Sequence, residues 1–438
     1  MSSIPRLAQA LEEILGSAAD DLARSTGFIQ RQRAFSGSQF ARTLVFGWLE
    51  NPHATCDELA DFASELGLTI SPQGLSARFS QPAVAFFEQL LQLALAQLIA
   101  ADPVAVPLLA RFPAVLLHDS TTISLPDLLA EQFRGCGGSR GRVAAAIKAH
   151  LRLELRTGCL EGPLLQDGRA HDRAVGFRRR PEPGSLLVRD LGFFQLDELA
   201  AEAGSGRYWL SRLKPRTAIW HQGERVELSQ LLEAQQGEQV ELAVELGLKQ
   251  RIACRLLAVR VPQEVAEQRR RRLRKEARDK GQTVGAERLA LCEWTILVTN
   301  VPAEMLSLVE ALVLLKLRWQ IEVLFKLWKS HGGVDKLRGR RAERLLVELY
   351  AKFLGRLVEH WLLLTGCWQQ VERSLLKAAK RVRVAARRLA EALSDGQRLR
   401  AELERVVEKM QRAARQARRQ KEPNAYRLLL DPSLLALS

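Results

Sequence analysis

The sequence has 438 residues, of which 47% are hydrophobic and 26% are charged, and its formal net charge at pH 7 is +15. This length allows two or three domains and a sizeable core. So strong a positive charge favours a polyanionic partner, either nucleic acid or an anionic membrane surface. The longest charge-free apolar run, from Gln89 to Ala101, is too short to span a bilayer, and the N-terminus has no secretory pattern. We therefore expect a cytoplasmic protein that works on DNA and does not enter the membrane.

The six cysteines are scattered, and no two of them form a Cys-x-x-Cys pair. This spacing argues against a zinc ribbon and against a disulfide framework, and it fits a reducing cytosol. We interpret all six as structural thiols.

Residues 1–105 are predicted to form a helical DNA-binding region. Thr55 and Glu58 make a capping box, and Ser71 followed by Pro72 marks a second helix start shortly afterwards. Two helices joined by a tight turn are typical of a helix-turn-helix, placed here at 55–80. Gln73 and Arg78 are then candidates to read base edges in the major groove. The alternative is a helical hairpin inside an ordinary bundle.

From Ala114 the pattern changes to buried strands. The first runs into the polar residues His118 to Thr122, and two more strands follow at 147–155 and near 164–168. Short turns between them predict an antiparallel meander. The glycine-rich stretch 135–141 lacks Gly-Lys-Ser/Thr, so we interpret it as a connector and not as a phosphate loop.

A second group of elements follows a basic loop. A buried strand at 185–189 ends next to Asp190, and a helix at 196–203 leads to another strand at 207–213. A strand–helix–strand unit implies a parallel crossover, so the predicted sheet is mixed.

Residues 214–300 are predicted to form a strand-rich insertion. Short apolar segments alternate with turns, and 222–224 and 236–238 are the expected hairpin tips. The run from Arg269 to Lys275 holds six positive residues, which would repel one another unless they are solvated or paired with phosphates.

A helix without glycine or proline is predicted at 317–329. Arg318, Glu322, Lys326 and Lys329 would lie along one of its faces beside an apolar face. Such a ladder of charges is also common on helices that are merely solvated. Beyond it we expect a long apolar helix at about 343–364 and two very basic helices at roughly 371–421, which could pack on a partner subunit or follow a phosphate backbone.

Three carboxylates stand out by position. Asp119 and Asp190 are expected at the carboxyl ends of strands, where polar side chains point into a functional crevice, and Glu322 lies on the later helix. Converging carboxylates suit hard cations such as Mg²⁺ or Mn²⁺, and two such ions can activate a water and stabilise a leaving oxygen. Simpler roles are a turn residue for Asp119, a helix cap for Asp190 and an ion pair for Glu322. The rival acids are Asp127, Asp172 and Asp197, and we interpret His118 and His171 as structural or as supporting the metal ligands, not as catalytic.

These residues carry a family resemblance. The segments 116–122, 168–172 and 189–194, together with Arg318-x-x-x-Glu322 and the later Lys329, resemble the DDE transposases of bacterial insertion sequences, and within them the insertion sequence four group. The resemblance extends from the helical N-terminal region to about residue 365. One position departs from it, because Leu315 stands where the family pattern has a tyrosine that could bond a phosphate.

The resemblance implies an α/β fold with a ribonuclease H-like mixed sheet core at 106–365. A β-rich insertion at 214–300 would interrupt the core, and a basic helical region at 366–438 would follow it. It implies that Asp119, Asp190 and Glu322 ligate two Mg²⁺ ions, with Mn²⁺ as a substitute. The other implied or predicted DNA-binding residues are Arg318, Lys326, Lys329, Trp294 (as a platform for a flipped base, or simply a packed strand residue), Trp319, Arg269, Arg270 and Arg271.

The implied function is a transposase that binds the terminal inverted repeats of its own element and carries out DNA cleavage and strand transfer. Double-stranded DNA, both transposon ends and target, and a second copy of the chain in a synaptic complex are its expected partners. One alternative is a catalytically decayed or domesticated relative that acts only as a sequence-specific DNA-binding protein. Another is a basic nuclease for structured DNA.

Overall fold

The computed structural model describes residues 3–31, 35–136, 144–171, 176–370, 373–413 and 425–435. The chain forms two compact units that each draw on several parts of the sequence. The first unit comprises Met1–Ala105, Asp119–Arg178 and Gln320–Arg418, and the second comprises Val106–His118, Arg179–Trp319 and Arg419–Ser438. Helices and a large mixed sheet confirm the mixed α/β class. None of the described helices has the length and apolar content that a membrane crossing requires.

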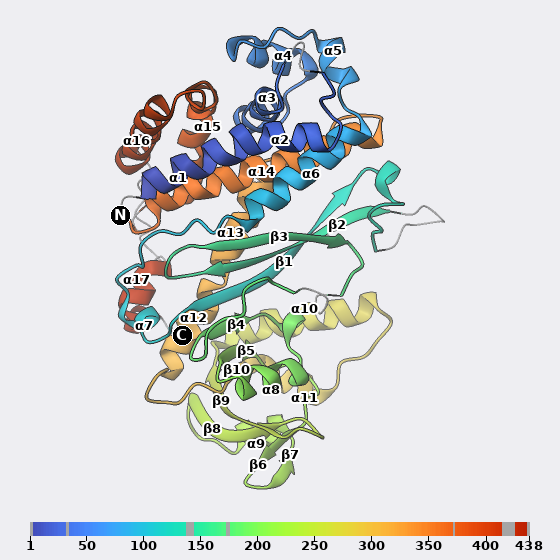
Figure 1. Ribbon diagram of the computed structural model, residues 1–438. Coiled ribbons are helices and arrows are strands. Elements are labelled where there is room, and N and C mark those ends of the chain that lie inside the picture. Colours follow the sequence, from blue (N-terminus) through green and yellow to red (C-terminus); the bar gives the residue numbers. More distant parts are fainter. Residues whose placement is uncertain are drawn as a thin grey trace. The chain divides into compact units, whose positions relative to one another are not determined.

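The first unit is mainly helical, and α14 lies at its centre, packed against α3, α6 and α16 (Figure 1). Almost the whole length of α14 is buried, which explains its run of leucines. The helices of this unit are α1 (Ser3–Glu12), η1 (Glu13–Ser17), α2 (Ala18–Ser25), α3 (Gly37–Glu50), α4 (Cys56–Glu65), α5 (Pro72–Ala77), α6 (Gln81–Ala96), η2 (Asp127–Leu129), α13 (Trp319–Lys326, which begins at the last residue of the second unit), η7 (Leu327–His331), α14 (Ala342–Cys367), α15 (Leu375–Ala392) and α16 (Gly396–Ala413).

The two short helices predicted near residues 55 and 72 are confirmed as α4 and α5. Thr55 and Glu58 form the reciprocal capping box, and the Ser71 hydroxyl accepts a hydrogen bond from the backbone N–H of Gly74. Gly67 ends α4 with a φ of +74°, a left-handed conformation that costs glycine little. Local sequence chemistry therefore determines both boundaries of this helical pair.

The first unit also contains a small part of the sheet. Strands β2 (Ala145–Glu154) and β3 (Leu160–Asp167) pair antiparallel, and β1 (Val115–Leu125) is the next strand in the order β3-β2-β1. The strand order and the antiparallel β2–β3 pair agree with the predicted meander, whereas the connection from β1 to β2 runs through η2 and is not a short turn. Most of the glycine-rich connector, residues 137–143, lies outside the described residues.

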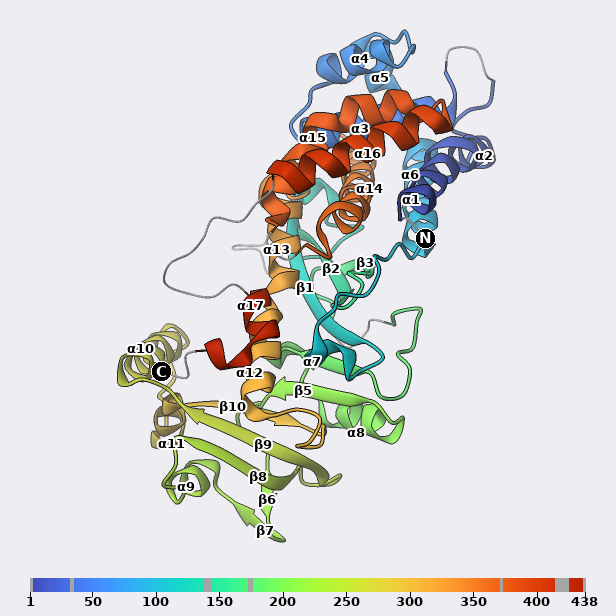
Figure 2. The same cartoon turned by 90° about the vertical axis from the view of Figure 1, so that its left-hand side faces the viewer.

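The second unit contains the longer part of the same mixed sheet. The first residues of β1 pair in parallel with β4, and β4 pairs in parallel with β5, so the predicted crossover through α8 is confirmed. All further pairs are antiparallel, in the order β5-β10-β9-β8-β6-β7 (Figure 2). These strands are β4 (Leu186–Arg189), β5 (Tyr208–Arg212), β6 (Ile219–His221), β7 (Glu224–Val226), β8 (Gln239–Leu246), β9 (Ile252–Arg260) and β10 (Trp294–Thr299).

Helices flank this sheet, and a hydrophobic core that includes Trp209, Leu256 and Val298 lies within the unit. Helix α17 packs on α12. The helices of the second unit are α7 (Pro107–Ala110), η5 (Leu191–Phe193), α8 (Leu196–Gly204), α9 (Leu228–Glu233), α10 (Gln263–Asp279), α11 (Ala286–Ala290), η6 (Leu291–Glu293), α12 (Leu308–Leu317), α17 (Ala425–Leu430) and η8 (Pro432–Leu434).

Residues 214–300 are less uniformly strand-rich than expected. The β6–β7 hairpin turns at Gln222 and Gly223 as predicted, with φ values of +54° and +85°. The second expected hairpin tip, at 236–238, is wrong, because α9 precedes it and the segment only links that helix to β8. The cationic run lies inside the 17-residue helix α10, whose Gln, Glu, Ala, Arg and Lys residues are strong helix formers.

Candidate active site

The two candidate aspartates follow a matched pair of backbone positions. In the second unit β1 and β4 run parallel from Val115↔Leu186 to His118↔Arg189. Asp119 and Asp190 are the next residues of the chain after these two positions. His118 packs its ring on Phe193 with centroids 4.0 Å apart, which supports the structural interpretation of this histidine.

Asp119 is not at the end of its strand, contrary to the expectation. β1 continues to Leu125, and its last four residues alternate between exposed (Thr122, Ser124) and buried (Ile123, Leu125). The β-branched residues after Asp119 favour extended backbone, so the polar stretch prolongs the strand instead of ending it. The carboxylate of Asp119 accepts a hydrogen bond at 2.8 Å from the backbone N–H of Ser120.

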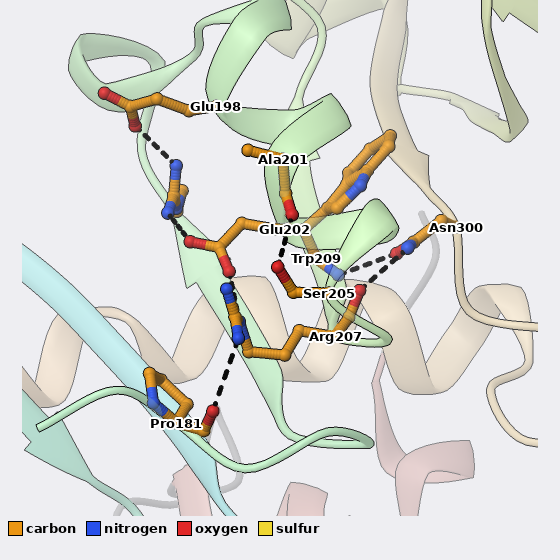
Figure 3. Close-up of polar contacts among 9 residues, drawn as sticks. Pro181, Glu198, Ala201, Glu202, Ser205, Arg207, Trp209 and Asn300 are labelled. Atoms are coloured by element: carbon orange, nitrogen blue, oxygen red, sulfur yellow. Dashed lines mark hydrogen bonds and ion pairs between the residues drawn. The ribbon is translucent and has the colours of Figure 1, made fainter.

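Asp190 directly follows β4, as predicted, and a buried arginine braces the strand just before it. Arg189 donates to Glu198 at 2.7 Å and to Glu202 at 2.9 Å, two residues that lie one turn apart on α8. Glu202 also pairs with Arg207, whose backbone carbonyl accepts from Asn300 (Figure 3). This network was not predicted from the sequence. The available signal was an arginine ahead of a strand-end aspartate, with two glutamates at helical spacing after it.

The segment that carries Glu322 is not one uniform helix. α12 ends at Leu317, Arg318 is its C-cap, α13 covers Trp319–Lys326, and the last turn, Leu327–His331, is a π-helix. A π-turn adds a residue and rotates the later part of the helix, so Lys329 does not continue the regular face of Arg318 and Glu322. Such turns are frequent at functional sites.

Lys329 has a partner within the first unit. Its Nζ donates at 2.7 Å to the backbone carbonyl of Thr122, three residues beyond Asp119 on β1. Partial burial lowers the pKa of Lys329 from its ordinary value. The contact joins the helix of Glu322 to the strand of Asp119, and Glu322 itself is half-buried in the first turn of α13.

Arg318 lies beside the other aspartate. Its Nε is 3.8 Å from Oδ1 of Asp190, and the Asp190 side chain keeps 35% of its exposure. Leu315, one turn earlier, is buried in α12 and offers no hydroxyl. The tyrosine contact of the family pattern is therefore absent at this position.

The donor chemistry of the three acids suits a hard cation, because all three supply carboxylate oxygens. Across the described ranges, however, no three His, Cys, Asp or Glu side chains come close enough together to hold a metal ion. Asp119 and Glu322 belong to the first unit and Asp190 to the second. Among the rival acids, Asp127 opens η2, Asp197 accepts from Gln250, and Asp172 lies outside the described residues.

Comparison with known proteins places these residues in a family. The family described as "Transposase DDE domain" matches residues 110–357, more than half of the chain. The chain belongs to this DDE transposase family. The resemblance to bacterial insertion-sequence transposases is thereby confirmed, and the insertion sequence four group agrees with it.

Individual relatives match a larger share of the chain than that region. The transposase for insertion sequence element IS231F of Bacillus thuringiensis subsp. israelensis is 30% identical over 362 residues, which cover 77% of this chain and 75% of the relative. The transposase for IS231B of Bacillus thuringiensis subsp. berliner is 28% identical, with the same coverage. The transposase for IS1151 of Clostridium perfringens is 24% identical over 79% of this chain and 77% of its own length.

The predicted DNA-binding residues of the transposase differ in their surroundings. Gln73 and Arg78 are exposed, and the Arg78 guanidinium lies 5.0 Å from the centre of the Phe35 ring. Trp319 is 55% exposed and Lys326 is exposed. These four side chains are available to a ligand.

Trp294 is instead a packed strand residue. It is 6% exposed, belongs to the hydrophobic core of the second unit, and carries the Arg260 guanidinium 4.7 Å from its ring centre. Arg269 and Arg270 also have internal partners, whereas Arg271 is exposed. The packing alternative for Trp294 thus matches its environment, and its stacking role stays a prediction.

Proposed function

We propose that this transposase binds the terminal inverted repeats of its own element and carries out Mg²⁺-dependent DNA cleavage followed by strand transfer. The observation that carries the proposal is the hydrogen bond from Lys329 to Thr122, which joins the Glu322 helix to the Asp119 strand. The parallel register that ends immediately before Asp119 and Asp190 supports it. Membership of the DDE family supplies the reaction class.

Asp119, Asp190 and Glu322 would hold the metal, with Mg²⁺ as the natural ion and Mn²⁺ as a substitute. Bound there, such ions activate a water molecule and stabilise the leaving oxygen of a phosphodiester. The chain's own contribution is to fix its ligands. The Arg189 network braces the strand before Asp190, and the Lys329 contact fixes the helix of Glu322.

The cations near these acids would receive the DNA. Arg318, beside Asp190, and Lys326, exposed one turn after Glu322, place positive charge where phosphates would approach. Trp319 presents an exposed ring that could stack on a base. We also propose that α4 and α5 contribute end recognition through Gln73 and Arg78, and that two copies assemble on paired ends.

Single-residue variants test the metal ligands. With DNA that carries the element's own inverted repeats, Asp119→Asn, Asp190→Asn or Glu322→Gln should reduce Mg²⁺-dependent cleavage below detection while leaving end binding intact. Asp127→Asn and Asp197→Asn are the matched controls, since they remove equal charge from rival acids and should retain activity. Cleavage retained by any of the three ligand variants would overturn the assignment.

A second candidate is a relative that binds the inverted repeats without cutting them. One observation favours it, since Leu315 lacks the hydroxyl of the family pattern. Specific end binding without cleavage in either Mg²⁺ or Mn²⁺ would establish this alternative.

A further inference from the structure

Helix α10 carries its positive charge on two opposite faces. At about 100° per residue, one face is turned towards the rest of the second unit, and Ala266 and Ala277 on it are buried. Arg269 lies on the same side, and burial lowers its pKa. The opposite face holds four exposed cations, which we call the α10 stripe: Arg271, Arg274, Lys275 and Arg278.

Two arginines fasten α10 to its neighbours. Arg269 donates to the backbone carbonyl of Trp294 and to the Thr295 hydroxyl, both at 2.9 Å and both on β10. Arg270 pairs with Glu267 and with Glu293. The positive charge of these two side chains is therefore used to hold the helix in place.

The α10 stripe has no such internal use. None of its four side chains has an ion pair with an acid in the described part of the chain. Glu264 and Glu267 lie on the same side of the helix before Arg271, and Asp279 lies beside the stripe at its C-terminal end. Glu267 is already paired with Arg270, and four cations against these acids leave this face with a positive charge over its last two turns. The stripe spans about 10 Å of helix axis, and duplex DNA carries one negative charge per about 1.7 Å of its own axis.

We propose that the α10 stripe is a contact surface for the phosphate backbone of duplex DNA, while Arg269 and Arg270 brace the helix that presents it. The proposal rests on the function proposed above, because it takes DNA as the partner. It divides the cationic run by function: Arg269 and Arg270 hold the helix, whereas Arg271, Arg274 and Lys275 contact the polyanion. Contacts to phosphates carry no base readout, so this binding is independent of sequence.

Salt dependence tests the stripe directly. The variant Arg271→Gln/Arg274→Gln/Arg278→Gln should bind a random-sequence duplex with a log–log salt slope that is shallower by about 2.7. Between 50 and 200 mM salt the wild type would then lose about 40-fold more affinity than the variant. The control removes three exposed cations elsewhere in the second unit, through Lys214→Gln, Arg225→Gln and Lys249→Gln.

An unchanged slope in the stripe variant, or an equal change in the control, would overturn the proposal. Arg269→Gln separates bracing from contact: it should leave the slope unchanged while it lowers the thermal stability and shifts the tryptophan fluorescence. A slope reduced by Arg269→Gln as much as by a single stripe substitution would contradict the division. Because the probe is random-sequence DNA, the salt slope can contradict the stripe even if the wild type cleaves its own ends. Equally, the salt slope can support the stripe in a protein that does not cleave those ends.

Discussion

Helices α10 and α14 are both rich in charged residues, yet they lie in opposite environments. On α14, Glu348, Lys352, Arg356 and Glu359 are each no more than 2% exposed. On α10, the four cations of the stripe are exposed. The same residue types therefore serve as core in the first unit and as surface in the second.

The difference follows from pairing. Glu348 lies one turn before Lys352, 2.7 Å from its Nζ, and Arg356 lies one turn before Glu359, also at 2.7 Å. Backbone carbonyls of Gly333 and Lys336 accept the remaining protons of Lys352. A charge can be buried only when it is paired and hydrogen-bonded, whereas the α10 stripe, without pairs, must stay in solvent.

Breaking the buried pair should have the largest effect on stability. Glu348→Gln leaves Lys352 charged without its carboxylate, and loss of one partner of a buried pair costs about 3–5 kcal/mol. Denaturant titration would measure this loss in the free energy of unfolding. A variant as stable as the wild type would show that the carbonyl contacts alone satisfy Lys352.

Lowering the pH should destabilise the protein through a second buried titratable group on α14. His360 is 2% exposed, its Nε2 lies 2.9 Å from the carbonyl oxygen of Gly158, and burial lowers its pKa to about 4. Between an unfolded pKa near 6.5 and that value, the unfolded chain binds more protons than the folded chain. The contribution of neutral His360 to the free energy of unfolding should therefore be fully present above about pH 6.5. Below that pH it should fall by about 1.4 kcal/mol per pH unit.

The matched variant isolates this histidine. His360→Gln cannot titrate, so the difference in unfolding free energy between wild type and variant should change across pH 6.5 to 4 and stay constant above it. Parallel pH profiles for the two proteins would exclude His360 as the source.

Local chemistry made part of this structure predictable. Thr55, Glu58 and Ser71 specify helix ends through contacts within four residues, and the β4–α8–β5 crossover follows from its order in the chain. The family and its reaction class could be predicted from the spacing of short motifs, because that spacing can be recognised without knowing how the chain packs.

Long-range contacts made the rest unpredictable. The bond from Lys329 to Thr122 joins positions 207 residues apart, and the π-turn that redirects Lys329 has no simple sequence signature. A tryptophan in a strand can face either side, so the burial of Trp294 also depended on tertiary structure. Tertiary packing determines which acidic side chains lie near one another. The sequence could therefore identify Asp119, Asp190 and Glu322 only as candidates.

The smallest effect is expected from the ion pair on the exposed side of α10. Arg272 donates to Glu276 at 2.8 Å, and both side chains are largely exposed, at 83% and 52%. Solvent and salt screen such pairs, so Glu276→Gln should leave the melting temperature unchanged within error, although the pair lowers the pKa of Glu276. The same Glu-to-Gln change at Glu348 is the direct counterpart. If the substitution on α10 destabilised the protein as much as the one on α14, pairing and burial would not be what separates these two helices.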